Sequence, residues 1–288
     1  MQGPIDDLLG LLDLEPLEVN IYRGRNRDIG AERVYGGQVF AQALVAARRT
    51  VDEKREAHSA HGYFILPGDL NAPIVYFVDR LRDGKSFTTR RVTAIQHGHA
   101  IFNLSASFHI EERGVSHQPT MPDVPDPETL KPELELIRKV EERIPLEHRA
   151  AIVQERPIDF RPVAPLDFFH PEKREPVRHV WFKSIGLLPD DTLMHQAVLA
   201  YASDYGLLIT ALQPHGIAFR SPGLQLASLD HSLWMHRSFR ADEWLLYSVD
   251  SPIATGARGF VRGQVFSRDG NLVASVAQEG LVRVRTPA

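Results

Sequence analysis

Three polar residues occupy positions where the surrounding pattern is apolar: Asp204, Ser228 and Gln278. A carboxylate, a hydroxyl and an amide can together form a buried hydrogen-bond cluster, and such a cluster can carry general acid–base chemistry. The same three groups can also be purely structural, with the aspartate reaching a surface groove while the serine and the glutamine satisfy backbone groups. The pattern alone leaves both interpretations open.

The composition narrows the chemistry available to such a site. The 288 residues contain no cysteine, which excludes disulfides, thiolate metal sites, iron–sulfur clusters and a cysteine nucleophile. Carboxylates, histidine, serine, threonine, lysine and tyrosine remain. The formal net charge of -4 argues against nucleic acid as a partner.

Two further features concern the place of the protein in the cell. Asp6 and Asp7 stand near the start, where a secretory signal would carry lysine or arginine. Apolar runs stay well short of the ~18 residues of a membrane span. We therefore expect a cytoplasmic protein without a membrane span.

The helices and strands that must position the three polar residues occur in the same order twice along the chain. A short amphipathic helix is predicted at 5–17. A buried helix at 39–49 and four strands follow, at 59–66, 73–81, 86–96 and 100–110. The order then returns with a strand at 177–185, a helix at 193–212, and strands at 224–229, 244–249, 259–267 and 272–285.

The stretch between the two copies differs in kind. Prolines punctuate it, and the charged run at 133–149 is most simply a solvated helix. We therefore predict a first unit at 1–111, a linker at 112–157 and a second unit at 158–288.

Residue intervals support a duplication. The interval from His58 to Gly98 is 40 residues, and the interval from His231 to Gly270 is 39. The second copy carries about fifteen extra residues before its histidine, which we place at 213–223. The predicted fold class is α+β, with two units in which an antiparallel sheet wraps a central helix.

Aligning the copies shows where they differ: Asp204 falls opposite Ala46, Gln278 opposite Ala106 and Ser228 opposite Arg55. The helix predicted at 193–212 places Asp204 on an apolar face, where an ionised carboxylate is costly unless it is hydrogen-bonded. Strand alternation places Gln278 on the inward face with Val276. Polar groups of one copy without counterparts in the other point to a function of the second unit.

Several stretches of the chain carry a further signal: 34–44 (VYGGQVFAQAL), 58–69 (HSAHGYFILPGD), 82–96 (RDGKSFTTRRVTAIQ), 201–204 (YASD), 211–216 (ALQPHG), 228–236 (SLDHSLWMH), 243–248 (EWLLYS), 257–263 (ARGFVRG) and 277–280 (AQEG). Together they resemble the bacterial acyl-CoA thioesterase II family and its eukaryotic peroxisomal relatives. The resemblance runs in register through nearly the whole chain and is weakest in the linker.

The resemblance implies a double hot-dog fold and the hydrolysis of acyl-CoA to free fatty acid and CoA. It carries the family's catalytic positions onto Asp204, Gln278 and, as the hydroxyl residue, Ser228. Asp204 is then the general base for a water nucleophile that Gln278 and Ser228 hold. The resemblance also implies a homodimer or a larger homo-oligomer. We expect no cofactor and no metal.

The supporting groups stay open at this stage. Donors for the developing oxyanion are expected among the backbone N–H groups of a buried helix start, either around Gly36 and Gly37 or near His195. His58 could assist as a proton shuttle, although its repetition at His231 favours a structural role. Residues that contact CoA, and the preferred acyl length, are not identified by the pattern.

Other functions fit the sequence less well. The spacing of His58 and His61 does not favour a metal site, because strand residues three apart face opposite ways. The sequence has no Gly-x-Ser-x-Gly elbow, which argues against an α/β-hydrolase. A catalytically silent acyl-CoA-binding module remains as an alternative, as does an enoyl-CoA hydratase with an Asp-x4-His pair, which Asp28 and Asp69 do not form.

Overall fold

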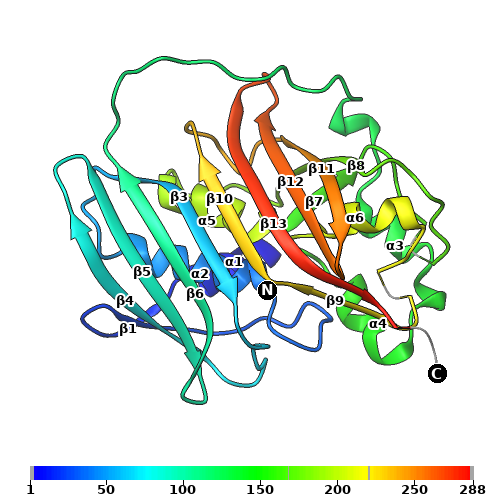
Figure 1. The fold of residues 1–288 in the computed structure, drawn as a ribbon, viewed down its shortest axis with the longest axis horizontal. Helices are drawn as coiled ribbons and strands as arrows, with labels where there is room; N and C mark the ends of the chain where they lie inside the picture. The colour runs from blue at the N-terminus through cyan, green and yellow to red at the C-terminus, as the bar shows by residue number, and fades with distance from the viewer. Residues whose placement is uncertain (1–2, 168, 220, 286–288) are drawn as a thin grey trace.

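In the computed structural model, a 13-stranded antiparallel sheet packs against two central helices (Figure 1). The structure describes residues 3–167, 169–219 and 221–285. The strand order is β1-β2-β4-β5-β6-β3-β10-β13-β12-β11-β8-β7, and β9 pairs with β13 beyond the end of β10. Helices α2 and α5 lie on the same face of the sheet, where the main apolar core forms.

In the first unit, α2 (Gly36–Arg48) is the central helix, and its residues from Gly37 to Ala47 are buried. Small and apolar residues make up most of its circumference, so it can be covered on all sides. Around it lie β1 (Glu15–Glu18), β2 (Ile21–Gly24), β3 (Glu56–Phe64), β4 (Ile74–Asp83), β5 (Phe87–Gln96) and β6 (His99–His109). The first helix, α1 (Pro4–Leu12), is shorter than predicted, because the chain turns into β1.

In the second unit, α5 (Thr192–Ser203) takes the place of α2. Its sheet contains β7 (Ile158–Pro162), β8 (Val177–Ser184), β9 (Leu224–Ser228), β10 (Asp230–Met235), β11 (Leu245–Thr255), β12 (Arg258–Ser267) and β13 (Leu272–Val284). The ends of the chain, 1–2 and 286–288, belong to the predicted units but lie outside the described residues.

Strands β3 and β10 join the two units edge to edge. They pair antiparallel with Ala60 opposite Leu233, so one continuous sheet passes from one unit to the other. The predicted fold class, a double unit with a helix in each antiparallel sheet, is confirmed. Because α2 and α5 also contact each other, the start of one helix can approach the end of the other.

The two histidines that align the copies do not point the same way. Ala57 pairs with Phe108 and Ser59 with Ser107, so His58 is an extra residue in a β-bulge. His58 therefore turns to the outer face of the sheet and lies 2.8 Å from the Ser107 hydroxyl. The equal intervals correctly indicate the duplication, but they do not predict the direction of these side chains.

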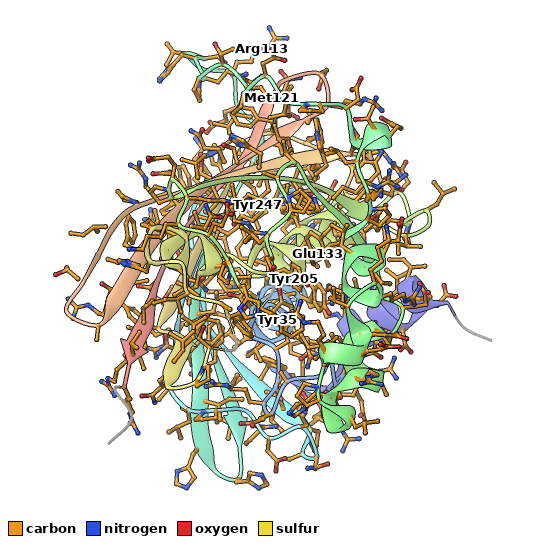
Figure 2. All side chains as sticks on the ribbon, turned by 90° about the vertical axis from the view of Figure 1, so that its right-hand side faces the viewer. Tyr35, Arg113, Met121, Glu133, Tyr205 and Tyr247 are labelled. Atoms are coloured by element: carbon orange, nitrogen blue, oxygen red, sulfur yellow. The ribbon has the colours of Figure 1, made fainter. Side chains whose placement is uncertain are left out.

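Residues 110–157 cross from the end of β6 over the sheet to the far edge, where β7 begins (Figure 1). The segment contains two short α-helices, α3 (Glu133–Arg138) and α4 (Leu146–Val153), instead of the single charged helix predicted there. Met121 and Val124 pack against a second apolar cluster, formed by Trp181, Trp244, Leu246 and Phe266. The predicted linker therefore also covers part of the second unit (Figure 2).

Candidate active site

Asp204 lies at the end of α5. The prediction of one continuous helix at 193–212 is wrong, because α5 stops at Ser203 and a turn leads to the short helix α6 (Ile209–Leu212). Gly206 in this turn has a left-handed φ of 65°, and Arg178 donates to its carbonyl oxygen at 2.8 Å. Asp204 is consequently the C-cap of α5 and does not lie on an apolar helix face.

Gln278 lies on β13 beside this carboxylate. Its side chain is buried on the same face as Val276, as strand alternation predicts. Nε2 of Gln278 donates to Oδ1 of Asp204 at 2.6 Å, a short charge-assisted hydrogen bond. Among the described residues, Oε1 of Gln278 is buried without a partner. A second hydrogen-bond acceptor therefore remains available next to the carboxylate.

Ser228 is the last residue of β9, where it pairs with Gly280 of β13. It approaches Asp204 from the strand next to that of Gln278, and its hydroxyl hydrogen-bonds to the carboxylate. The structure thus brings together the three residues that were selected from the sequence. Their catalytic roles stay a prediction.

The start of α2 is directed at the same carboxylate. The backbone N–H of Gly37 hydrogen-bonds to Asp204, as an unpaired N–H of a helix start can. Gly36 permits this approach, since a Cβ there would lie 2.6 Å from Oδ2 of Asp204. Of the two predicted helix starts, this one reaches the site. His195 does not, because it precedes Asp204 by nine residues, ~14 Å along α5.

The ionisation of Asp204 reflects two opposing influences. Burial raises its pKa from 3.8 to about 6, although hydrogen bonds from Gln278, Gly37 and Ser228 lower it. The C-terminus of α5 disfavours a negative charge at this position, whereas the start of α2 favours one. Asp204 is therefore ionised at neutral pH and close to its midpoint, which suits a general base.

Two tyrosines to which the sequence pattern assigns no role lie beside the end of α5: Tyr247 is buried and Tyr35 is partly buried (Figure 2). Tyr35, the N-cap of α2, donates to the carbonyl of Tyr201 at 2.8 Å, and Tyr247 of β11 donates to the carbonyl of Ser203 at 2.9 Å. Burial, with the nearby Asp204 adding to it, raises the pKa of both phenols, so both stay neutral. They fix the backbone just before Asp204.

The predicted linker reaches the turn after Asp204 through a buried ion pair. Glu133 of α3 is 7% exposed, so the prediction of a solvated helix is wrong for this residue. Its carboxylate accepts from the Tyr205 hydroxyl at 2.7 Å and pairs with Arg156 at 3.1 Å (Figure 2). The Tyr205 ring stacks on Phe160 with centroids 4.4 Å apart. The residue that follows Asp204 is therefore held by the linker.

We expect Glu133→Ala to lower the free energy of unfolding by about 3 kcal/mol, because Arg156 would be left largely buried without a counter-charge. Urea unfolding measures this loss. Glu135→Ala is the matched control, since that carboxylate lies on the same helix in an exposed pair with Lys139 at 2.9 Å; such a pair is worth less than about 1 kcal/mol. Equal unfolding midpoints for the two variants would contradict this role of Glu133.

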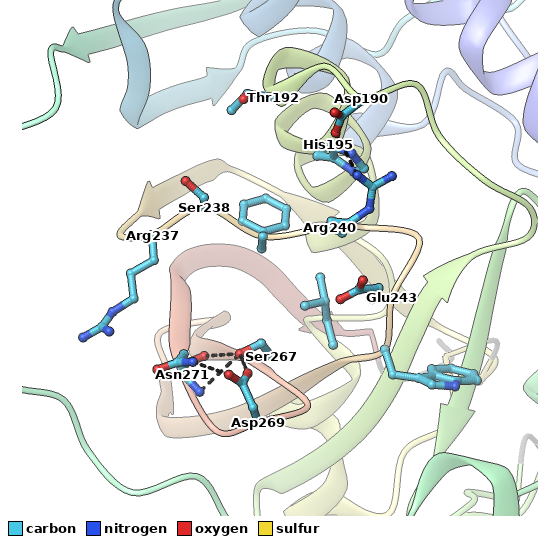
Figure 3. A pocket seen from close by; sticks show the side chains of 13 residues that line it. Asp190, Thr192, His195, Arg237, Ser238, Arg240, Glu243, Ser267, Asp269 and Asn271 are labelled. Atoms are coloured by element: carbon cyan, nitrogen blue, oxygen red, sulfur yellow. Dashed lines mark hydrogen bonds and ion pairs between the residues drawn. The ribbon is translucent and has the colours of Figure 1, made fainter.

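His58 and His195, which the sequence also raises as possible contributors to the site, lie away from Asp204. His58 contacts Ser107 and the Phe87 ring on strands of the first unit. Nδ1 of His195 accepts from the Ala241 N–H at 3.0 Å, and the residue lines a surface hollow of about 610 Å³ near the start of α5 (Figure 3). This hollow contains none of the three predicted residues and is lined by both arginines and carboxylates.

Two observations concern metals and membranes. Within residues 3–167, 169–219 and 221–285, no three histidine, aspartate or glutamate residues are grouped so that they could hold a metal ion. In the same ranges, no helix is long and apolar enough to cross a membrane.

Comparisons with known proteins agree with the motifs. A family model described as acyl-CoA thioesterase matches residues 148–281, and one described as its N-terminal domain matches residues 23–109. Acyl-CoA thioesterase 2 of Haemophilus influenzae is 41% identical, over 98% of this chain and 99% of its own. Human acyl-coenzyme A thioesterase 8 is 42% identical, over 96% of this chain and 88% of its own.

Solved structures agree as well. The crystal structure of an acyl-CoA thioesterase II from Mycobacterium marinum is 44% identical, with a TM-score of 0.79 over 97% of this chain and 99% of its own. A hot-dog protein from Alicyclobacillus acidocaldarius has the same TM-score and coverage at 18% identity, which shows the fold alone. Fold and relatives together define a thioester hydrolase of the hot-dog class. The chain belongs to the acyl-CoA thioesterase II family.

Proposed function

We propose that this chain hydrolyses fatty acyl-CoA to free fatty acid and CoA, with a water nucleophile that Asp204 activates and that Gln278 and Ser228 position. One observation carries this proposal: the 2.6 Å hydrogen bond that joins Gln278 to a buried Asp204 at the start of α2. A carboxylate whose pKa lies near 6 can take a proton from water and is still ionised at neutral pH.

The unpartnered Oε1 of Gln278 supports the placement of the water. That oxygen can accept one hydrogen of a water whose other hydrogen points to Asp204. The Ser228 hydroxyl, which hydrogen-bonds to the same carboxylate, would lie on the other side of this water. A water held in this way has its lone pair fixed toward an incoming carbonyl carbon.

We assign the developing oxyanion to the start of α2. The Gly37 N–H is directed at Asp204 and the Gln38 N–H donates to the Tyr35 carbonyl at 3.1 Å, so the Gly36 N–H is the donor that we assign to the oxyanion. The helix dipole favours negative charge at this position. Gly36 and Gly37 have no side chain that would keep a thioester away from this helix end. The thiolate of CoA is a good leaving group, so no strong general acid is required.

We expect Gln278→Ala to lower kcat about thirtyfold, because the variant lacks the amide group that contacts both the water and the carboxylate of Asp204. The measurement is free-thiol release from acyl-CoAs of increasing chain length, which also reports the preferred substrate. Gln264→Ala, on the exposed side of β12, is the matched control and should keep the wild-type rate. A wild type that binds acyl-CoA but releases no thiol would instead favour the silent binding module.

We also propose the domain boundaries, the oligomeric state and the cellular location of this enzyme. The end of β6 at His109 and the start of β7 at Ile158 support units at 1–111 and 158–288 with a linker at 112–157. Exposed Tyr63 and Phe77 on the sheet support a homodimer or a larger homo-oligomer. Acyl-CoA as the substrate is consistent with a cytoplasmic enzyme.

A further inference from the structure

A fourth buried polar side chain lies against Asp204 and has no role in the steps above. His231, on β10, is fully buried, and its Nδ1 lies 4.0 Å from Oδ1 of Asp204. The ring of Phe40, from α2, meets the imidazole edge-on at a centroid distance of 4.9 Å. Packing from both units therefore fixes this ring beside the carboxylate.

The hydrogen bonds of Ser203 determine the tautomer of His231. The Ser203 hydroxyl donates its one hydrogen to the carbonyl of Ala200 at 3.0 Å, and the same oxygen lies 2.8 Å from Nε2 of His231. That oxygen must therefore accept from Nε2–H, which leaves Nδ1 with a lone pair. Within the described residues, Nδ1 has no partner. Burial lowers the pKa of His231 to about 3, so the ring stays neutral.

The other groups around Asp204 direct their hydrogens elsewhere or already donate to the carboxylate. The hydroxyls of Tyr35 and Tyr247 donate to backbone carbonyls, and Arg178 of β8 donates to the Gly206 carbonyl. Gln278, Ser228 and the Gly37 N–H hydrogen-bond to Asp204 itself. Oε1 of Gln278 is the acceptor assigned above to the water. Nδ1 of His231 remains as an acceptor for a proton on Asp204.

We propose that His231 is a positioning residue for Asp204: its Nδ1 accepts a hydrogen bond from the protonated Oδ1 and thereby holds the proton that Asp204 has taken from water. The inference rests on the proposed function, in which Asp204 is the base. A side-chain adjustment of about 1 Å would bring the two atoms to hydrogen-bond distance. Oδ1 can still accept from Gln278 in this state.

The step balances without a further reactant. One O–H bond of the water breaks as an O–H bond to Oδ1 of Asp204 forms, and the freed electron pair of the water oxygen forms the C–O bond to the thioester carbon. The π electron pair of the carbonyl moves onto its oxygen, which becomes the oxyanion. When the adduct collapses, that pair forms the C=O bond again, and the C–S bond breaks with its electron pair going to sulfur. Asp204 then returns the proton to the thiolate. In between, the proton stays on Asp204 and is hydrogen-bonded to Nδ1 of the neutral His231.

Two variants test the pairing. His231→Gln keeps an amide N–H within reach of Ser203 and has no acceptor where Nδ1 was. Ser203→Ala removes the acceptor of Nε2–H, so the imidazole can carry its hydrogen on Nδ1 and donate to ionised Asp204. His236→Gln is the matched control, because Nε2 of His236 also lies 2.9 Å from a serine hydroxyl, that of Ser275.

The readout is the titration midpoint of the Asp204 carboxyl by carbon NMR, with its signal assigned through Asp204→Asn. We expect both variants to lower this midpoint by about one pH unit, because each favours the ionised carboxylate, while His236→Gln leaves it unchanged. We also expect His231→Gln to lower kcat about tenfold at about pH 8.

An Asp204 midpoint within about 0.2 pH units of wild type in either folded variant would overturn the inference, since a purely structural histidine would not move it. The titration requires no turnover. A wild type that releases no thiol would therefore refute the proposed function, whereas an unchanged midpoint would refute the role of His231 alone.

Discussion

Asp204→Asn is expected to lower kcat for acyl-CoA hydrolysis about a thousandfold at about pH 8. The amide keeps the shape of the carboxyl group and can still accept from Gln278, but it cannot take a proton from water. The wild-type rate should fall as the pH drops through about 6, because only the ionised carboxylate is a base. The residual rate of the variant should lack this acid limb. Thiol release from about pH 5 to about pH 9 measures both effects.

Asp204→Asn should raise folding stability although it lowers activity. A stable but inactive variant would show that the activity is lost with the base and not through unfolding. The pKa of Asp204 is about 6 in the folded chain, against an ordinary 3.8. The folded state therefore binds the proton more tightly, and stability falls by about 3 kcal/mol in total as the pH rises from well below the lower of these pKa values to well above the higher one. Asp204→Asn avoids this loss, so it should be more stable than wild type by about 2 kcal/mol at about pH 8.

Urea unfolding at about pH 4 and about pH 8 provides the control, since the advantage of the variant should disappear at the lower pH. An inactive Asp204→Asn that is less stable than wild type at the higher pH would contradict this account. Its inactivity would then be a consequence of misfolding.

Gly36→Ala is expected to lower kcat about a hundredfold. The added methyl group would lie 2.6 Å from Oδ2 of Asp204 and 2.9 Å from the Phe64 ring. Either the carboxylate or the start of α2 must move, and both movements weaken the hydrogen bond from Gly37. Alanine is the better helix former, so destabilisation of α2 itself would not explain the loss. Thiol release at saturating substrate measures the effect.

Gly114→Ala is the matched control, because a Cβ at that position meets nothing within 4 Å. It should keep the wild-type rate and melting temperature. A Gly36→Ala variant with an unchanged kcat would show that the close approach of α2 to Asp204 does not matter for the reaction.

The three polar residues could be selected from the sequence because the chain contains its own reference copy. Ala46 and Ala106 show what the same positions carry when no polar group is needed, and strand alternation correctly placed Gln278 on the inward face. The end of α5 could not be predicted in this way. The apolar pattern continues through Leu207 and Leu208, whereas the break depends on distant contacts such as the one from Arg178 to Gly206.

The linker and the histidines show two further limits. Glu133 belongs to a charged run, and its burial depends on Arg156, a partner 23 residues away that no local pattern reveals. Equal residue intervals align His231 with His58, but the bulge in β3 turns the His58 side chain to the other face of the sheet. A single extra residue is enough to reverse the direction of a strand side chain, and neither composition nor periodicity marks it.

The contact between α2 and α5 has a consequence for the stoichiometry of the enzyme. In an assembly of two identical units, the central helix of each unit would need two features at once. Its start would have to offer free N–H groups to one site, and its end would have to carry the carboxylate of the other site. Here α2 begins with Gly36 and Gly37 and has Ala46 at its other end, whereas α5 has His195 near its start and ends on Asp204. If the proposed roles hold, duplication within one chain has divided these two tasks between the helices, and we expect each chain to contribute one reaction centre rather than two.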